Sequence, residues 1–176
     1  IVANHSGSYI LIDGANRFEA LKQIGCKAIL AQLVDYASSD VVLKSWYHFV
    51  SFMTIEELIE FAAGNKLITA SLTDIRKPES KNELIVHSTS GKVLSVMLSG
   101  DLETMLGELS ALNRFYDEKY SYTRIDSDTD ISRIKELSPD EGLLFVFPEL
   151  SKDDIVKIAG LKQKLPAGIS RHLIPN

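Results

Sequence analysis

The stretch of sequence that decides the fold runs from Ser8 to Tyr36 and reads SYILIDGANRFEALKQIGCKAILAQLVDY. An apolar run over residues 9–12 ends at Asp13-Gly14, as a buried strand does where it meets a turn. Apolar residues then recur at helical spacing over residues 18–24, and a glycine follows as a helix stop. Residues 29–34 are almost wholly apolar. The stretch therefore predicts a strand, a glycine turn, a short helix and a second strand.

The junction between the first strand and the helix carries Asp13, Gly14, Asn16 and Arg17. Backbone N–H groups and the positive end of the helix dipole make such a junction a natural anion site. The Asp13 carboxylate could hold Mg²⁺ or accept a hydroxyl proton, or it could only cap the helix. Arg17 could bind a phosphate through two hydrogen bonds, or form an ion pair with Asp13 or Glu19. Asn16 can donate a hydrogen bond to a phosphate.

Two other groups of polar and aromatic residues lie far along the chain. Trp46 and His48 are two positions apart in KSWYHF, on one face if the segment is extended. A structural role in or near the core is the alternative for both rings. Ser170, Arg171 and His172 follow a glycine in LPAGISRHLIPN, and their hydroxyl, guanidinium and imidazole groups suit a phosphate.

These blocks resemble known proteins. The Asp-Gly-x-x-Arg box between a strand and a helix resembles the signature of the ParB/sulfiredoxin superfamily. The KSWYHF and LPAGISRH blocks resemble its free L-serine kinase branch, which includes relatives described as regulators of siderophore biosynthesis. The resemblance implies a ParB-like core over residues 1–40, lacking its N-terminal part, and a second α+β unit over residues 41–176. The expected fold class is α+β (mixed α/β), with the site in the cleft between the units.

The resemblance also implies an activity, the transfer of a phosphoryl group from ATP or ADP to free L-serine with Mg²⁺, to give O-phospho-L-serine. It implies Asp13 as a catalytic residue and magnesium ligand, and Gly14, Asn16 and Arg17 at the nucleotide phosphates. The substrate residues that it implies are Trp46, His48, Ser170, Arg171 and His172. Related kinases tend to carry histidine where this chain has Asn16, and often threonine where it has Ser170. The general base of the family is a glutamate that precedes the box. We therefore expect the full-length protein, and not this 176-residue chain alone, to be the active phosphotransferase.

Two other functions fit parts of the sequence. A non-catalytic ParB-like module that senses a nucleotide or associates with DNA is favoured by Asn16 and by the absent base. A net charge of −5, a pI of about 5.4 and the lack of a basic stripe argue against DNA as a partner. A sulfiredoxin-like reductase needs a reactive cysteine near the box. Cys26 lies past the helix, and we expect it to be a buried structural thiol.

Composition and motifs exclude several further classes of protein. The chain has 176 residues, of which 45% are hydrophobic and 24% charged, as in ordinary soluble proteins. The single cysteine rules out an internal disulfide, and the apolar runs are far shorter than the roughly 18 residues of a membrane span. With no signal peptide, we expect a cytoplasmic protein. The acidic turn at residues 126–130 lacks the glycine and the glutamate of a calcium loop, and the lack of a Walker loop excludes P-loop kinase chemistry.

Overall fold

The computed structural model describes residues 1–5, 7–137, 140–161 and 164–174. Its helices are α1 (Ala15–Gln23), α2 (Ile55–Gly64), α3 (Leu102–Asp117), the 3₁₀ turn η1 (Ile131–Arg133), α4 (Ile134–Leu137) and α5 (Lys152–Gly160). Its strands are β1 (Val2–His5), β2 (Ser8–Leu11), β3 (Leu33–Asp35), β4 (Val42–Ser51), β5 (Ile68–Leu72), β6 (Glu83–Ser88), β7 (Val93–Met97), β8 (Tyr122–Asp126), β9 (Gly142–Val146) and β10 (Ser170–Leu173). This mixture of helices and strands confirms the α+β fold class.

The first part of the chain forms a small sheet of three strands in the order β2-β1-β3. β1 and β2 form an antiparallel pair, and β3 runs parallel to β1 after the helix α1. The predicted strand over residues 29–34 is largely wrong, because only its last two residues belong to β3. The ladder between β1 and β3 begins at Val2 and Leu33, so the preceding residues have no strand opposite them.

A larger sheet of seven strands has the order β10-β4-β9-β6-β7-β5. Its seventh strand, β8, also pairs with β4. All of its neighbouring strands are antiparallel. The ten-residue strand β4 pairs with β10 through its first half and with β8 and β9 through its second half. Residues 170–172 of β10 lie opposite residues 43–45 of β4, so Trp46 comes just after this ladder and His48 lies opposite β8 and β9.

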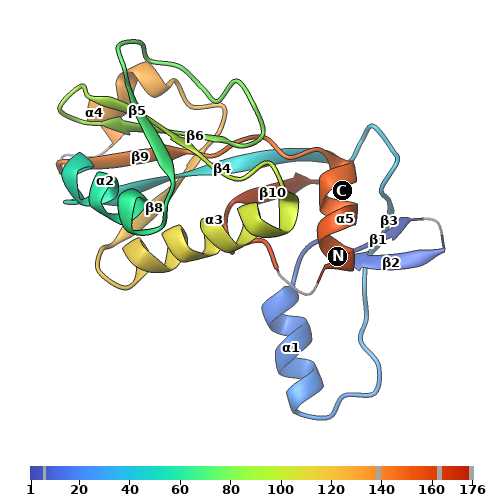
Figure 1. Ribbon diagram of the computed structural model, residues 1–176. Helices are drawn as coiled ribbons and strands as arrows, with labels where there is room; N and C mark the ends of the chain where they lie inside the picture. The colour runs from blue at the N-terminus through green and yellow to red at the C-terminus, as the bar shows by residue number, and fades with distance from the viewer. Residues whose placement is uncertain (6, 138–139, 162–163, 175–176) are drawn as a thin grey trace.

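The two faces of the larger sheet pack against different helices, which Figure 1 shows on opposite sides of it. α3 buries an apolar stripe, as its spacing predicts, and α2 packs beside it on the same face. α2 begins at a capping box in which Thr54 and Glu57 each bond the other's backbone N–H. Ile131 and Ile134 cover the other face, where Tyr47 and Phe49 of β4 are buried.

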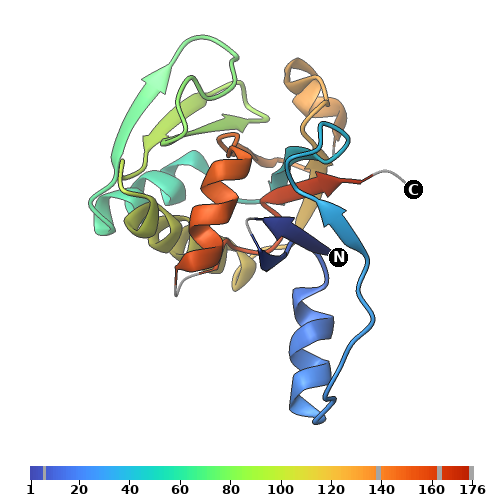
Figure 2. The ribbon, with the colours of Figure 1, turned by 90° about the vertical axis from the view of Figure 1, so that its right-hand side faces the viewer.

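The small sheet joins the main core through residues that come from distant parts of the chain. Ala3, Ile10 and Tyr36 are buried in the same cluster as Ile155 of α5 and Ile169 just before β10. α5 lies beside the small sheet in Figures 1 and 2, and it contacts β2. The small sheet is therefore held against the part of the chain that bears Ser170, Arg171 and His172, which we call the closing block.

Helix α1 projects from the body of the protein, and the chain returns from it to β3 beside the helix (Figures 1 and 2). None of its residues is buried. The expectation that Cys26 is buried is wrong, because it lies at the tip of this projection with no core around it and is exposed. Among the described helices, none is both long and apolar enough to cross a bilayer.

Candidate functional site

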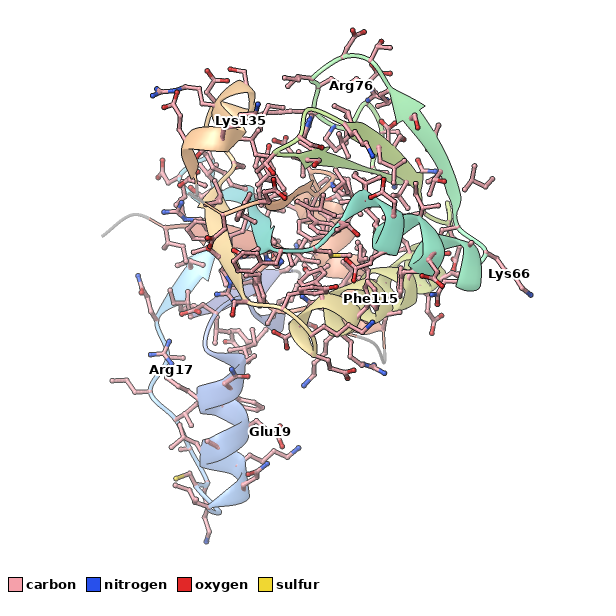
Figure 3. The ribbon with its side chains drawn as sticks, turned by 90° about the vertical axis from the view of Figure 1, so that its left-hand side faces the viewer. Arg17, Glu19, Lys66, Arg76, Phe115 and Lys135 are labelled. Atoms are coloured by element: carbon pink, nitrogen blue, oxygen red, sulfur yellow. The ribbon has the colours of Figure 1, made fainter. Side chains whose placement is uncertain are left out.

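The turn that enters α1 holds a carboxylate and a guanidinium together at the protein surface. Arg17 Nη2 donates a hydrogen bond of 3.1 Å to Asp13 Oδ2, and both side chains are more than half exposed. Gly14 between them has φ of 87°, a left-handed conformation that favours glycine. A Cβ on Gly14 would lie 3.3 Å from Arg17 Nη2, so the glycine lets the guanidinium fold back over the turn. Arg17 thus pairs with Asp13, and Figure 3 shows Glu19 elsewhere on α1.

The same turn forms one end of a cavity with a volume of about 520 Å³. Asp13, Gly14 and Arg17 supply its polar end. Phe18 of α1 and Ile29 of the returning segment are among its apolar lining residues. Asn16 is exposed on the first turn of α1, and its side chain makes no hydrogen bond to the described part of the chain. A pocket of this size, apolar along its length and charged at one end, has the make-up of a small-molecule site.

His172 on β10 lies against Tyr36, which directly follows β3. The Tyr36 hydroxyl is 2.9 Å from His172 Nε2, and the ring centroids are 5.7 Å apart. Lys152, the first residue of α5, places its ammonium 5.5 Å from the centre of the Tyr36 ring and donates a hydrogen bond to the Ser38 carbonyl. An aromatic hydroxyl, an imidazole and an ammonium therefore meet where the small sheet touches β10.

Electrostatics link this group to the turn before α1. Burial is the main cause that lowers the pKa of His172, and the positive charge of Lys152 lowers that pKa further. The Asp13 carboxylate acts on His172 in the opposite sense and raises its pKa. Asp13 of the first polar box and His172 of the closing block therefore interact electrostatically.

The closing block itself is divided by the pleat of β10. Successive side chains of a strand point to opposite faces, so Ser170 and His172 share one face and Arg171 lies on the other. The Arg171 guanidinium lies 4.4 Å from the centre of the Trp46 ring and forms an ion pair with Asp126. Arg171 therefore forms a separate cluster with Trp46, on the face of β10 away from Ser170 and His172.

His48 is fully buried and has both ring nitrogens engaged within the protein. Nδ1 lies 2.6 Å from the Tyr116 hydroxyl, and Nε2 lies 2.8 Å from the Gly168 carbonyl oxygen. Burial lowers the pKa of His48 to about 4, so the ring is neutral at physiological pH. The structure places His48 beneath the loop that leads into β10, not at a surface that faces solvent.

Two residues of this region were missed by the sequence analysis. Lys152 follows the N-cap of α5, and its ammonium lies over the ring of Tyr36, the partner of His172. Tyr36 is the last residue of the opening stretch, and its partner lies 136 positions later. No local pattern marks a pairing over that distance.

The described residues contain no group of three or more His, Cys, Asp or Glu side chains placed to hold a metal ion. Magnesium is usually bound by one or two carboxylates together with water and substrate phosphates, and does not need a protein cage. The exposed carboxylate of Asp13 fits that mode of binding.

Comparisons with known proteins find relatives in one group, although no family model matches the chain. An ATP-dependent L-serine kinase from Staphylothermus marinus is 23% identical over 178 residues, which cover 95% of this chain and 67% of that protein. A free serine kinase in complex with AMP superposes with a TM-score of 0.74 at 19% identity, over 99% of this chain and 72% of the other. C-terminally truncated SbnI from Staphylococcus aureus superposes with a TM-score of 0.73 at 22% identity, over 99% of this chain and 68% of the other.

These matches confirm the resemblance to the free serine kinase branch that the three sequence blocks indicate. The superpositions cover nearly the whole chain, so the protein has the fold of those structures.

Proposed function

We propose that this chain belongs to a small-molecule kinase that transfers a phosphoryl group from ATP or ADP to the hydroxyl of free L-serine, giving O-phospho-L-serine. The observation that carries the proposal is the contact of Tyr36 with His172, which joins the end of the first sequence block to the last one. The relatives support it, since one is described as an ATP-dependent L-serine kinase and another holds AMP. The site then lies between the units formed by residues 1–40 and 41–176.

The cavity beside α1 is the proposed nucleotide site. Its apolar length suits a base and a ribose, and its polar end suits phosphates. Arg17 keeps guanidinium donors free beyond its single hydrogen bond to Asp13, and Asn16 adds an amide donor. Asp13 would hold Mg²⁺, whose charge neutralises phosphate oxygens. The N–H groups after Gly14 complete an arrangement of donors around one end of the cavity.

The proposed serine end of the site is the face of β10 that bears Ser170 and His172. Its hydroxyl and neutral imidazole offer hydrogen bonds, and the nearby Lys152 offers positive charge to a phosphoryl group. Phosphoryl transfer depends mostly on positioning and charge neutralisation, which these groups supply. Trp46 and Arg171 lie on the other face of the strand, and we assign them to the substrate end as the wall behind it.

The test uses the full-length protein with Mg²⁺, L-serine and either ATP or ADP, and looks for O-phosphoserine by mass spectrometry. We expect product with the natural protein, and a loss of at least about tenfold in rate with Asp13→Asn. Glu19→Gln on the same helix is the matched control and should keep the natural rate. Failure of the natural protein to form product with either nucleotide would refute the kinase proposal.

The second candidate is a non-catalytic ParB-like regulator that binds a nucleotide or associates with DNA. Asn16 favours it, because an amide cannot change its charge or act as a base where related kinases tend to carry histidine. Retention of DNA in a shift assay at moderate salt, together with no O-phosphoserine, would support this alternative.

A further inference from the structure

A buried line of hydrogen bonds connects α3 to the loop that precedes β10. Asn113 Nδ2 donates to the Tyr116 hydroxyl oxygen at 2.8 Å, and that hydroxyl lies 2.6 Å from His48 Nδ1. On the other side of the ring, His48 Nε2 lies 2.8 Å from the Gly168 carbonyl oxygen. One helix, one strand and one loop are thus joined through a single imidazole.

The chemistry of the groups fixes the direction of every bond in this line. A carbonyl oxygen only accepts, so Nε2 of His48 carries the hydrogen that reaches Gly168. The ring is neutral, because burial lowers the pKa of His48 to about 4, and Nδ1 is therefore an acceptor. Burial also raises the pKa of Tyr116, which keeps its hydroxyl protonated and able to donate to Nδ1. The Tyr116 oxygen in turn accepts from Asn113. Each donor has one acceptor.

The loop at the end of this line has little freedom. Gly168 has φ of 84°, a left-handed conformation that other residues rarely adopt, and its backbone lies against the Arg124 guanidinium. Ile169 is buried, and its carbonyl accepts a 2.8 Å hydrogen bond from the Trp46 N–H. Bonds from His48 and Trp46, two residues apart on β4, thus hold the two residues that precede Ser170.

We propose that Tyr116, acting through His48, is a positioning residue that sets the Gly168–Ile169 loop and with it the placement of Ser170 and His172 at the serine end of the site. This inference rests on the proposed function and deepens it. Tyr116 lies on α3 and fully inside the core, so it acts on the substrate only through the loop. The line also assigns His48 a role beneath the loop in place of direct contact with substrate.

The chain offers a matched pair of variants to test this proposal. Tyr116→Phe removes one oxygen and keeps the ring that packs edge-on against His48. Tyr122→Phe removes the hydroxyl of a second tyrosine, whose ring centroid lies 4.7 Å from that of His48. The Tyr122 hydroxyl makes no hydrogen bond within the described residues, so its removal leaves the line intact. A role limited to packing in the core would give the two variants similar effects.

The experiment measures O-phospho-L-serine binding by calorimetry and the KM values for L-serine and nucleotide, on the full-length protein. For Tyr116→Phe we expect affinity for O-phospho-L-serine to fall about fivefold or more and the KM for L-serine to rise, with the nucleotide KM unchanged. Tyr122→Phe should stay within about twofold of the natural protein. Natural affinity in Tyr116→Phe, or equal losses in both variants, would overturn the inference.

A second readout separates this inference from the proposed function. In an NMR spectrum of the protein without ligand, Tyr116→Phe should shift the backbone amide signals of Ser170 and His172, and Tyr122→Phe should leave them in place. If the natural protein binds no O-phospho-L-serine, the proposed function fails, and these amide signals still decide whether Tyr116 sets the loop. If these signals do not move in Tyr116→Phe, the hydrogen bonds from Tyr116 through His48 do not position the loop, and the inference is refuted.

Discussion

The hydroxyl of Tyr36 lies 2.9 Å from Nε2 of His172, and this contact joins the end of the small sheet to the last strand of the larger one. Tyr36 is almost fully buried, and burial raises its pKa to about 12, so the hydroxyl keeps its proton at physiological pH. The Lys152 ammonium lies 5.5 Å from the centre of the Tyr36 ring, and the charges of Lys152 and Asp13 both act on the pKa of His172. The relative position of the two sheets at the proposed site therefore depends on this contact.

Removal of the Tyr36 hydroxyl should weaken both the fold and the site. Tyr36→Phe deletes the bond to His172 and leaves a half-buried imidazole nitrogen without its partner, which costs about 1 kcal/mol in the free energy of unfolding. Urea unfolding measures that loss, and calorimetry should show weaker binding of O-phospho-L-serine. Tyr9→Phe, which alters an exposed tyrosine on β2, is the control and should change neither quantity. An unchanged affinity in Tyr36→Phe would separate this contact from the site.

The pKa of His172 should respond in opposite directions to two substitutions. Lys152→Met removes a positive charge that lowers this pKa, so the pKa should rise. Asp13→Asn removes a negative charge that raises it, so the pKa should fall. An NMR titration of the His172 ring measures both shifts, and Lys157→Met, an exposed lysine farther along α5, is the control. Shifts of the same sign, or none with Asp13→Asn, would show that the two ends of the chain do not meet.

Sequence reasoning succeeded where structure is set by neighbouring residues. The capping box at Thr54 and Glu57 and the apolar stripe of α3 depend on contacts three or four positions apart, which the sequence displays directly. It failed over residues 26–32, where an apolar composition predicted a strand and a buried cysteine. Whether such a segment pairs depends on a strand far away in the sequence, and here the ladder of β1 and β3 begins only at Leu33.

At the candidate site, too, the sequence did not reveal arrangements that depend on distant parts of the chain. The sequence singled out residues 170–172 as one phosphate-binding group, but the pleat of β10 turns Arg171 away from its two neighbours. The alternation is a general property of strands, but three consecutive polar residues after Gly168 were interpreted as one group. Lys152 is near His172 only because α5 packs beside the small sheet, which no local pattern reveals.

The pleat of β10 makes a direct prediction for its three polar residues. Ser170→Ala should weaken binding of O-phospho-L-serine by about tenfold, or about 1.4 kcal/mol, if its hydroxyl contacts the phosphate. Arg171→Ala should have a smaller effect, because its guanidinium lies on the other face with Trp46 and Asp126. Calorimetry on both variants decides the order. A greater loss for Arg171→Ala would place the substrate on the Trp46 face of the strand.

A buried ion pair should matter far more to stability than an exposed one in this protein. Glu83 accepts hydrogen bonds of 2.9 and 2.6 Å from the Arg76 guanidinium and one of 2.7 Å from Ser95, and the bonds from Arg76 are the main cause that lowers its pKa to about 2. Glu83→Gln should reduce the free energy of unfolding by about 2 kcal/mol, because it removes the buried charge that accepts two hydrogen bonds from Arg76 and leaves only the exposed Glu79, at 3.8 Å, as a charged partner. Figure 3 shows Arg76 at the edge of the fold, on the loop between β5 and β6.

The control for that substitution is Glu56→Gln. Glu56 pairs with Lys92 at 2.6 Å, but both side chains are mostly exposed, so solvent screens the pair. Urea unfolding at neutral pH should show little change for Glu56→Gln. Equal losses for the two variants would mean that the Arg76–Glu83 pair is as well screened as the surface pair.

The buried state of His48 predicts how stability depends on pH. Its pKa is about 4 in the folded protein against a usual value of 6.5, so between these pH values the unfolded chain binds more protons than the folded one. The free energy of unfolding should therefore fall as pH decreases from 6.5 to 4, by roughly 3 kcal/mol, because one pKa unit is worth about 1.4 kcal/mol. Below the folded pKa both states carry the proton, and this contribution stops changing.

The burial of His87 and His172 lowers the pKa of each, so both add to the same trend, and a variant is needed to isolate His48. His48→Gln lacks the titrating ring, so its unfolding free energy should fall less steeply over this pH range, whatever its stability at neutral pH. Urea unfolding at a series of pH values gives the slopes of the natural protein and of His48→Gln. A slope in His48→Gln as steep as in the natural protein would show that His48 accepts its proton in the folded state, and that the line from Tyr116 to Gly168 does not hold the ring neutral.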